Sequence, residues 1–471
     1  MFFSQKKLFP KKYKHNITLL FYLVMILLAL NISQAATYYV STTGSDSNAG
    51  TISAPWKTIQ TSLGKLKPGD ILYIRAGTYA QSFSDEIVVK GAASQSIVIT
   101  SYPGESPVIG HIILAAGSQY VKITRLSFDG SLGSNEDCIK IENNDDGTSN
   151  HIEISYNELK RCDMQGMLIG GEDYTVIGNY IHNTGGRREG DHGIYAWGRR
   201  WTISNNVITD SAACGIQFWP GLEDSTISHN TIVATGGSGI GLTGAGSSEG
   251  TYYGSSMPGT SKNNLIVNNI IAFQTNTVPS YHAGCSIVTF WGGTVGSGNI
   301  VRNNLMYGNA LGNLNCQGGS DGLTIESNNK VADPLFVNRG PNAPDITSSG
   351  TSNGYPLLVN PPSGYDTVRD LHLKVGSPAI DVGVNAGAIL DKDGNPRPQG
   401  TAWDIGAYEY VSGATLTGDV NQDGKVDVLD VQKLVNIILG IEPSVGSADV
   451  NKDGSVNVLD VQQVVNIILG V

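Results

Sequence analysis

The densest group of reactive side chains lies in one short stretch of the 471-residue sequence. It contains the guanidinium groups of Arg187 and Arg188, the carboxylate of Asp191, the imidazole of His192 and the phenol of Tyr195. Near neutral pH an imidazole can remove a proton, a phenol can supply one, and a guanidinium can stabilise the negative charge that develops in between. The stretch therefore predicts proton-transfer chemistry. A hydrogen-bonded turn histidine, a packed surface tyrosine and solvated loop arginines are the structural alternatives.

Two other stretches have the oxygen-rich spacing of a 12-residue calcium-binding loop. The pattern D-x-N-x-D-G-x5-D begins at Asp419 and again at Asp449, 30 residues later. A calcium ion needs six or more oxygen ligands, and a glycine at the sixth position permits the sharp turn. Each loop leads into a segment with helical apolar periodicity, 431–440 and 461–470, so the sequence predicts two bound Ca²⁺ ions. The expected ligands are the side chains of Asp419, Asn421, Asp423, Asp427 and Asp430 with the carbonyl of Lys425, and those of Asp449, Asn451, Asp453, Asn457 and Asp460 with the carbonyl of Ser455.

The reactive group sits inside a repeat of short strands. From residue 150 onward, a β-branched or apolar residue precedes an asparagine by three positions and an apolar residue follows it by two. The spacing between asparagines is 22, 27, 24, 39, 35 and 24 residues. Such a repeat predicts a solenoid of β-coils in which the asparagines stack on one another and bind the turn backbone. These asparagines are Asn157, Asn179, Asn206, Asn230, Asn269 and Asn304, and a further Asn328 follows 24 residues after Asn304 and three after Ile325.

A second strand recurs between successive asparagines, and its residues alternate with period two. One set is apolar and should fill the solenoid, while the other should point outward on a single face. The inward set is Ile139, Ile141, Met167, Ile169, Ile194, Ala196, Ile216, Phe218, Ile240 and Leu242. The outward set is Lys140, Glu142, Leu168, Tyr195, Trp197, Gln217 and Trp219.

Residues 36–411 resemble the right-handed parallel β-helix superfamily that includes pectate lyases, alginate lyases and mannuronan epimerases. Residues 56–66 would then form the amphipathic helix that caps its open N-terminal end. After a short linker, 412–415, residues 416–471 resemble a complete type I dockerin, which docks onto a cohesin domain of a scaffold protein. The dipeptides Val428-Leu429 and Val458-Leu459 replace the small hydroxylated residues common at these loop positions, so the cohesin type stays open. The expected fold class is all-β with a small α-helical calcium-binding module.

This resemblance implies a lyase that cleaves a uronic-acid-containing polysaccharide. His192 would be the base, Asp191 would orient it or help to bind a metal, Arg187 or Arg188 would stabilise the enolate, and Tyr195 would protonate the leaving oxygen. Trp197 and Trp219 would lie one coil apart as a flat platform for sugar rings, with Gln217 and Lys140 as further substrate contacts.

Lys140 is a second candidate for the base, because some calcium-dependent lyases of this fold use a lysine. Its neighbours Asp137, Glu142, Asp145 and Asp146 would then be the possible ligands of a further calcium ion in the β-helix.

Two other functions remain open at this point. A glycoside hydrolase would need two carboxylates about 5 to 9.5 Å apart. The candidates are Glu189, Asp191, Asp210, Glu223 and Asp224. A β-helix that only binds polysaccharide, as an adhesin, is the third reading.

Composition and charge limit the environment of the protein. The formal net charge is −11, and the first 35 residues hold five lysines and no acid, so the remainder carries −16. Such a surface repels nucleic acid. The basic start, an apolar run over 17–30 and small residues before position 36 predict a signal peptide, residues 1–35, and a secreted, extracellular or scaffold-associated protein with no membrane span after cleavage. The five cysteines show no metal-binding spacing and suggest no particular disulfide.

Overall fold

The computed structural model describes residues 35–80, 86–133, 137–141, 148–185, 190–243, 259–275, 284–290, 295–314, 322–340, 369–411, 417–421, 426–451 and 453–469. The predicted signal peptide, apart from Ala35, and the predicted linker 412–415 lie outside these residues. Nothing in the structure therefore bears on either prediction.

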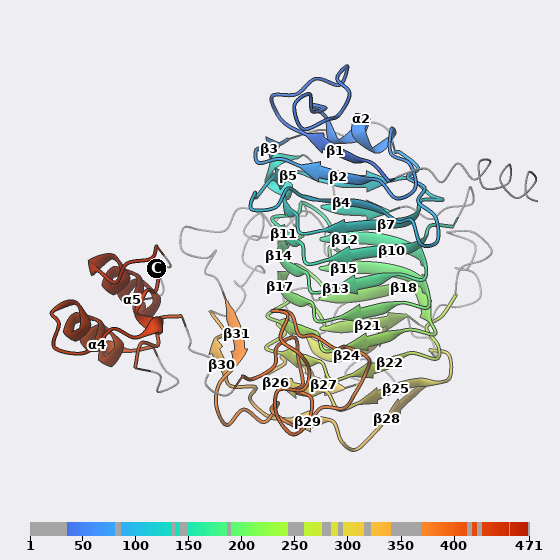
Figure 1. Cartoon of the computed structure of the whole chain (residues 1–471). Helices are drawn as coiled ribbons and strands as arrows, with labels where there is room; N and C mark the ends of the chain where they lie inside the picture. Colours follow the sequence, from blue (N-terminus) through green and yellow to red (C-terminus); the bar gives the residue numbers. More distant parts are fainter. Residues whose placement is uncertain are drawn as a thin grey trace, which may run out of the picture.

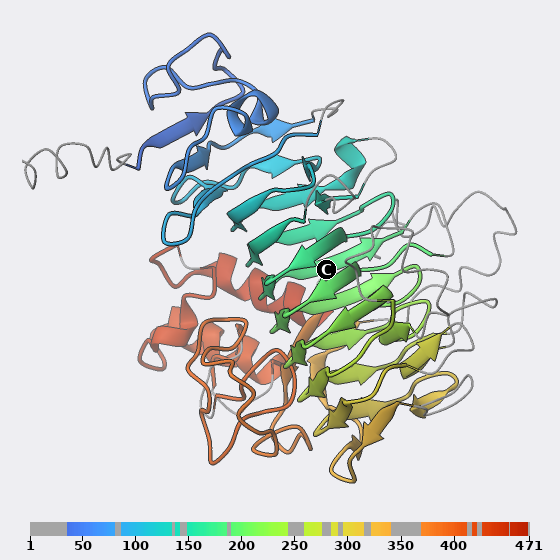
Figure 2. The same ribbon diagram turned by 90° about the vertical axis from the view of Figure 1, so that its right-hand side faces the viewer.

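Parallel β-coils stacked along one axis form the bulk of the protein, from the N-terminal end in blue to the strands in yellow and brown (Figures 1 and 2). Each coil contributes up to three short strands, and each strand pairs in parallel with its counterpart in the next coil. The predicted parallel β-helix is confirmed. The face that carries the candidate site comprises β6 (Ile112–Leu114), β9 (Ile139–Ile141), β12 (Met167–Glu172), β15 (Ile194–Arg199), β18 (Ile216–Glu223), β21 (Ile240–Thr243), β24 (Cys285–Phe290) and β27 (Gly312–Leu314).

The other two faces complete the coils. The second comprises β1 (Thr37–Val40), β2 (Ile71–Ile74), β4 (Ile97–Ser101), β7 (Gln119–Thr124), β10 (Asn150–Ser155), β13 (Thr175–Ile177), β16 (Thr202–Ser204), β19 (Thr226–Ser228), β22 (Leu265–Val267), β25 (Asn299–Arg302) and β28 (Leu323–Ile325). The third comprises β3 (Thr78–Tyr79), β5 (Val108–Ile109), β8 (Ser127–Asp129), β11 (Glu158–Lys160), β14 (Tyr180–Thr184), β17 (Val207–Ser211), β20 (Thr231–Val233), β23 (Ile270–Ala272), β26 (Leu305–Tyr307) and β29 (Lys330–Val331).

The interior of the coils is the hydrophobic core. Alternation along each strand sends one set of side chains inward, and parallel pairing then places like residues above one another. All ten residues of the predicted inward set are fully buried in this core. The period-two reading of the sequence is therefore confirmed for the strands of the site face.

An asparagine ladder runs along the turn between the second and third faces. The side-chain oxygen of each asparagine accepts the backbone N–H of the preceding one at 3.0 Å, from Asn157 through Asn179, Asn206, Asn230, Asn269 and Asn304. These side chains satisfy buried turn amides that no strand can pair. The last rung is Asn329, which accepts the Asn304 N–H at 3.0 Å, so the sequence assignment of Asn328 to the ladder is wrong by one position. Asn328 instead accepts the N–H of Asn303.

The N-terminal cap is smaller than the sequence suggested. The helix α2 (Ile59–Leu63) is five residues long, not the predicted 56–66, and the Thr58 side chain caps its first turn. Ile59 and Leu63 close the end of the core, and Trp56 is buried beside them in a non-helical segment. One helical turn is enough here because these three side chains already cover the first coil.

Residues 369–411 form a closing segment that packs against the third face of the solenoid. It begins with β31 (Asp370–Leu373), which pairs antiparallel with β30 (Phe336–Asn338). Two buried arginines attach it to the solenoid: Arg369 contacts Asp210 at 2.7 Å, and Arg397, which pairs with Glu409 inside the segment at 2.6 Å, contacts Asn205 at 3.1 Å. The segment also buries apolar residues of strands β17, β20, β23 and β26.

The C-terminal module contains α4 (Val428–Ile438) and α5 (Val458–Leu469), drawn in red in Figure 1, and a short 3-10 turn at Gly446–Ala448 between them. The solenoid has a similar 3-10 turn at Gly130–Leu132. Both helices begin earlier than predicted, because Asp427 caps α4 and the helix starts inside the loop. Their small core is Val420, Leu434, Ile437, Ala448, Val450 and Val464. Across the part of the chain that the structure describes, no helix has the length and hydrophobicity needed to cross a membrane.

Candidate active site and calcium loops

Four outward residues of the site face align across consecutive coils. Lys140 of β9 lies opposite Leu168 of β12, Leu168 lies opposite Tyr195 of β15, and Tyr195 lies opposite Gln217 of β18. Neighbouring parallel strands are about 4.8 Å apart, so Lys140 and Tyr195 are separated by roughly 10 Å of backbone. The amine of Lys140, the phenol of Tyr195 and the amide of Gln217 thus form one row along the axis of the β-helix.

Aromatic rings surround Tyr195 in an arrangement that differs from the predicted platform. The rings of Tyr195 and Trp219 are nearly parallel, with an interplanar angle of 10° and centroids 6.5 Å apart. Trp197 instead meets Tyr195 edge-on at 6.2 Å and is only 3% exposed. Its indole lies where a side chain at Gly170 would be, within 2.2 Å of an ideal Cβ, so this glycine makes room for the ring. The half-exposed pair available to a sugar is therefore Tyr195 and Trp219, not Trp197 and Trp219.

Gln217 is 2% exposed although the sequence placed it on the open face. Its Nε2 donates to Thr243 Oγ1 at 3.2 Å and to the Phe218 carbonyl at 3.3 Å. Its Oε1 is buried and accepts no hydrogen bond from the described residues. A buried acceptor without a partner is costly, so this oxygen is suited to accept a hydrogen bond from a ligand hydroxyl next to Tyr195.

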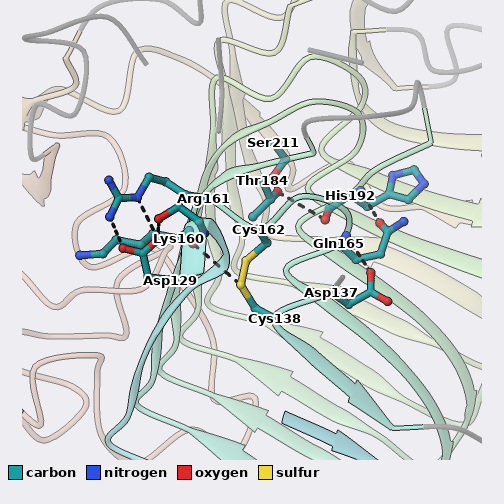
Figure 3. Close-up of a disulfide and its surroundings, with 11 residues drawn as sticks. Asp129, Asp137, Cys138, Lys160, Arg161, Cys162, Gln165, Thr184, His192 and Ser211 are labelled. Atoms are coloured by element: carbon teal, nitrogen blue, oxygen red, sulfur yellow. Dashed lines mark hydrogen bonds and ion pairs between the residues drawn. A yellow bond between two sulfur atoms is a disulfide. The ribbon is translucent and has the colours of Figure 1, made fainter. Parts of the chain in front are cut away.

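His192 lies in the turn that enters β15 and is 3% exposed. Its backbone N–H donates to Gln165 Oε1 in the preceding coil, and its Nδ1 accepts the backbone N–H of Cys214 in the following coil at 3.0 Å. Figure 3 shows His192 and Gln165 joined in this way, with Asp137 beyond them. The imidazole also lies nearly parallel to the Tyr195 ring, with centroids 5.3 Å apart. The structure thus brings His192 and Tyr195 together, as predicted.

The remaining predicted members of this group are only partly described. Arg187, Arg188 and Glu189 are outside the described residues. Asp191 is fully buried. At His192, the backbone N–H donates to Gln165 Oε1, the carbonyl accepts from Thr184 Oγ1, and Nδ1 accepts from the Cys214 N–H, so these contacts hold the turn and the imidazole in place.

Lys140 is partly exposed, and its Nζ lies 3.7 Å from Glu86. Of the calcium ligands suggested around it, Asp137 is buried and its Oδ1 accepts the backbone N–H of Gln165 at 2.8 Å. Glu142, Asp145 and Asp146 are outside the described residues. Among the residues described, no three His, Cys, Asp or Glu side chains form a cluster that could hold a metal ion.

A disulfide that the sequence did not assign braces the start of this face. Cys138, next to Asp137, is bonded to Cys162 in the following coil, with Cα atoms 5.5 Å apart (Figure 3). Cys285 is also disulfide-bonded. Cys214 is a buried thiol whose pKa is raised to about 12 by desolvation. Only coil register shows which cysteines are neighbours, and the sequence spacing of 24 residues was the one available signal.

The carboxylates suggested for a hydrolase are mostly engaged in structural contacts. Asp210 is paired with Arg369, Glu223 contacts Lys262 at 2.7 Å, and Asp224 accepts from Asn263 at 3.0 Å. Three of the five suggested carboxylates are thus held in structural contacts, and Glu189 lies outside the described residues.

The loop before α5 is held together by side-chain oxygens of its predicted calcium ligands. Asp449 accepts the N–H groups of Asp453 and Gly454, and Asn451 also accepts the N–H of Asp453, so these oxygens converge on one short turn. Asp460 is fully buried and accepts backbone N–H groups of Val450, Asn451 and Asn457. An all-oxygen donor set of this kind suits calcium.

The loop before α4 repeats this arrangement where it is described. Asp430 is buried and accepts the N–H groups of Asn421 and Asp427, and Asp419 is 1% exposed. Asp423 and Lys425, two of its predicted ligands, lie outside the described residues. The described residues of the second loop offer the carboxylate and amide oxygens that suit calcium, and Asp430 and Asp460, at the last position of each loop, are buried and accept backbone N–H groups of their own loops.

Comparisons with known proteins identify a family for each of the two parts of the chain. The profile of the family described as "Pel9A-like, right handed beta helix region" matches residues 38–310, and that of the "Dockerin type I domain" matches residues 417–469. A curated relative, pectate lyase PEL9 of Emericella nidulans, is 43% identical over 75 residues, which are 16% of this chain and 18% of that protein. The chain thus matches less than a fifth of the length of that relative.

Two solved structures illustrate the range of similar folds. Pectate lyase Pel9A is 14% identical, with a TM-score of 0.38, over 80% of this chain and 97% of its own. A protein described as a glycoside hydrolase is 10% identical, with a TM-score of 0.43, over 63% of this chain and 97% of its own.

Proposed function

The chain belongs to the Pel9A-like right-handed β-helix family and ends in a type I dockerin domain, and from this we propose that it is a secreted lyase. Its substrate would be a polysaccharide containing uronic acid, and its dockerin would attach it to a cohesin of a scaffold protein. The observation that carries the proposal is the row of Lys140, Tyr195 and Gln217 beside the Tyr195–Trp219 ring pair.

Elimination requires the removal of the proton on the carbon next to the uronate carboxylate. In the proposed reaction the neutral amine of Lys140 takes this proton, and a carbon–carbon double bond forms as the bond to the leaving oxygen breaks. Tyr195 donates its phenolic proton to that oxygen. Lys140 replaces His192 as the base in this scheme, because the Nδ1 of His192 already accepts a hydrogen bond from Cys214.

Two residues of the site face are assigned as substrate contacts, one because its ring is partly exposed and one because its side-chain oxygen accepts no hydrogen bond from the described residues. Trp219 would stack on a sugar ring, and Gln217 Oε1 would accept a hydroxyl proton. Because a stacking contact is made equally with bound substrate and transition state, Trp219→Ala should raise KM by about tenfold and leave kcat nearly unchanged. Steady-state kinetics on the purified variant would check this; a selective loss of kcat would assign Trp219 a role in the chemical step.

The reaction class is tested with a substrate panel. Pectate, alginate, glycosaminoglycan and neutral glycans are incubated with the protein while absorbance near 235 nm and new reducing ends are recorded. We expect both signals to rise with a uronate polymer. Reducing ends without absorbance would indicate a hydrolase, and binding without either signal would indicate a protein that only binds the polymer.

Calcium is the ion suited to the dockerin, and we propose one ion in each loop. When bound, it would neutralise the carboxylates that each loop gathers. Asp419, Asn421, Asp427 and Asp430, with Asp423 and the Lys425 carbonyl, would hold the first ion; Asp449, Asn451, Asp453, Asn457 and Asp460, with the Ser455 carbonyl, would hold the second.

The two halves of the dockerin expose matching apolar pairs. Val428 and Leu429 are 70% and 57% exposed, and Val458 and Leu459 are 70% and 58% exposed. This near-identity supports cohesin docking in two orientations related by a pseudo-twofold axis. Replacing one pair with Asp-Asp should then weaken cohesin binding by no more than a few-fold, whereas replacing both should abolish it. Calorimetric titration with the cohesin distinguishes the outcomes, and a large loss from one pair alone would contradict the dual mode.

A further inference from the structure

Three side chains link the turns that lead into the strands of the site face. Asp137 precedes β9, Gln165 precedes β12 and His192 precedes β15, each two residues before its strand. The Oδ1 of Asp137 accepts the N–H of Gln165 at 2.8 Å, the Oε1 of Gln165 accepts the N–H of His192, and the Nδ1 of His192 accepts the N–H of Cys214 at 3.0 Å. We refer to these three residues as the turn ladder; two of its links appear in Figure 3. All three are at least 93% buried, with exposures of 2%, 7% and 3%.

The hydrogen bond from the Cys214 N–H to the Nδ1 of His192 determines the protonation state of the imidazole. A nitrogen that accepts an N–H hydrogen bond carries no proton of its own, so Nδ1 is unprotonated. A neutral imidazole then carries its one proton on Nε2, and an imidazolium is excluded because both of its nitrogens would be donors. Neither nitrogen of His192 is available to take a proton from a substrate.

We infer that His192 is a positioning residue, held as the neutral Nε2–H tautomer by the turn ladder, whose ring fixes Tyr195 for catalysis. This rests on the proposed function insofar as Tyr195 acts on substrate. The imidazole lies nearly parallel to the phenol at an interplanar angle of 16° with centroids 5.3 Å apart.

Gln165 shows which substitution preserves this role. It occupies the equivalent position one coil earlier, where its Oε1 accepts the backbone N–H of the following coil and its Nε2 donates to the Gly190 carbonyl at 3.2 Å. A glutamine at position 192 can make the same bond to Cys214 but cannot act as a base. His192→Gln and His192→Ala therefore separate positioning from proton abstraction.

The experiment compares these two variants in the full-length protein on the uronate polymer identified by the panel. We expect His192→Gln to keep kcat/KM within about fivefold of the parent with the same pH profile, whereas loss of a general base costs about 10²- to 10⁴-fold. His192→Ala should lower kcat by about 10- to 100-fold through misplacement of Tyr195. A folded His192→Gln protein that loses about 10²-fold or more, or whose pH profile loses an acid limb, would overturn the inference.

A second measurement does not depend on activity. In the full-length protein with ¹⁵N-labelled histidines, the signals of His192, one of eight histidines, are identified by their absence from the His192→Gln spectrum. Between pH 6 and 8 we expect an unprotonated Nδ1 and a protonated Nε2. An imidazolium, or a proton on Nδ1, at pH 7 would overturn the inference. If the parent protein cleaves no uronate polymer, the proposed function fails, and the spectrum alone still decides the state of His192.

Discussion

Substitution of Lys140 by glutamine should lower kcat on the uronate substrate by about 10²- to 10⁴-fold, the usual loss on removal of a general base. Lys140 lies in the same row as Tyr195, and glutamine keeps much of its length without the basic amine. Because an ammonium cannot accept a proton, parent activity should rise with pH on the alkaline side of neutral as the amine loses its proton. Stopped-time absorbance assays across this range measure both effects.

The matched control is Lys122→Gln. Lys122 of β7 also points outward and forms an ion pair, with Glu153 at 2.6 Å, but it lies on the second face of the solenoid. Its replacement should leave kcat unchanged. Tyr195→Phe should resemble Lys140→Gln, since it removes the proton donor with little change of shape. Full activity in both Lys140→Gln and Tyr195→Phe would show that this row is not the catalytic site. The alternatives would then be a hydrolase that uses carboxylates or a protein that only binds the polysaccharide.

Removal of calcium should unfold the C-terminal module while the β-helix stays folded. Its core has six fully or nearly buried apolar residues, and its two loops gather carboxylates that repel one another without a cation. A ligand at about 1,000 times its Kd stabilises the folded state by about 4 kcal/mol, as much as a core of this size supplies. We therefore expect excess chelator to abolish cohesin binding as well as the fold.

Circular dichroism can follow this change in the full-length protein. The helices α4 and α5 are 11 and 12 residues long, whereas α2 has five, so most of the helical signal of the described residues comes from the module. Excess chelator should erase that signal and leave the β-helix thermal transition in place, and calcium should restore it. An unchanged helical signal would show that the loops do not need calcium. A lowered β-helix transition would instead support a further ion in the solenoid.

Local pattern was sufficient to predict the coils. The inward residues follow from period-two alternation, which depends only on the geometry of a single strand. The asparagine ladder follows from the repeat, and the calcium loops follow from ligand spacing within 12 residues. Where the sequence offered adjacent choices, as with Asn328 and Asn329, it could not decide, because each asparagine matches only half of the repeat. Ile325 lies three positions before Asn328, Val331 lies two positions after Asn329, and only the register of the last coil selects one.

The contacts that give the site its chemistry were decided by the stacking of coils. Trp197 is buried because Gly170 lies beside it one coil away, and His192 accepts from Cys214 because the next turn places that N–H against Nδ1. Arg369 and Asp210 meet across 159 residues of sequence. The residue pattern within one strand cannot predict these contacts between coils. The path of the loops between the strands determines which residues become neighbours in the next coil. The sequence by itself thus determined which side chains face the core and which loops suit calcium, and the tertiary structure determined which polar groups are already paired and which are left for a substrate.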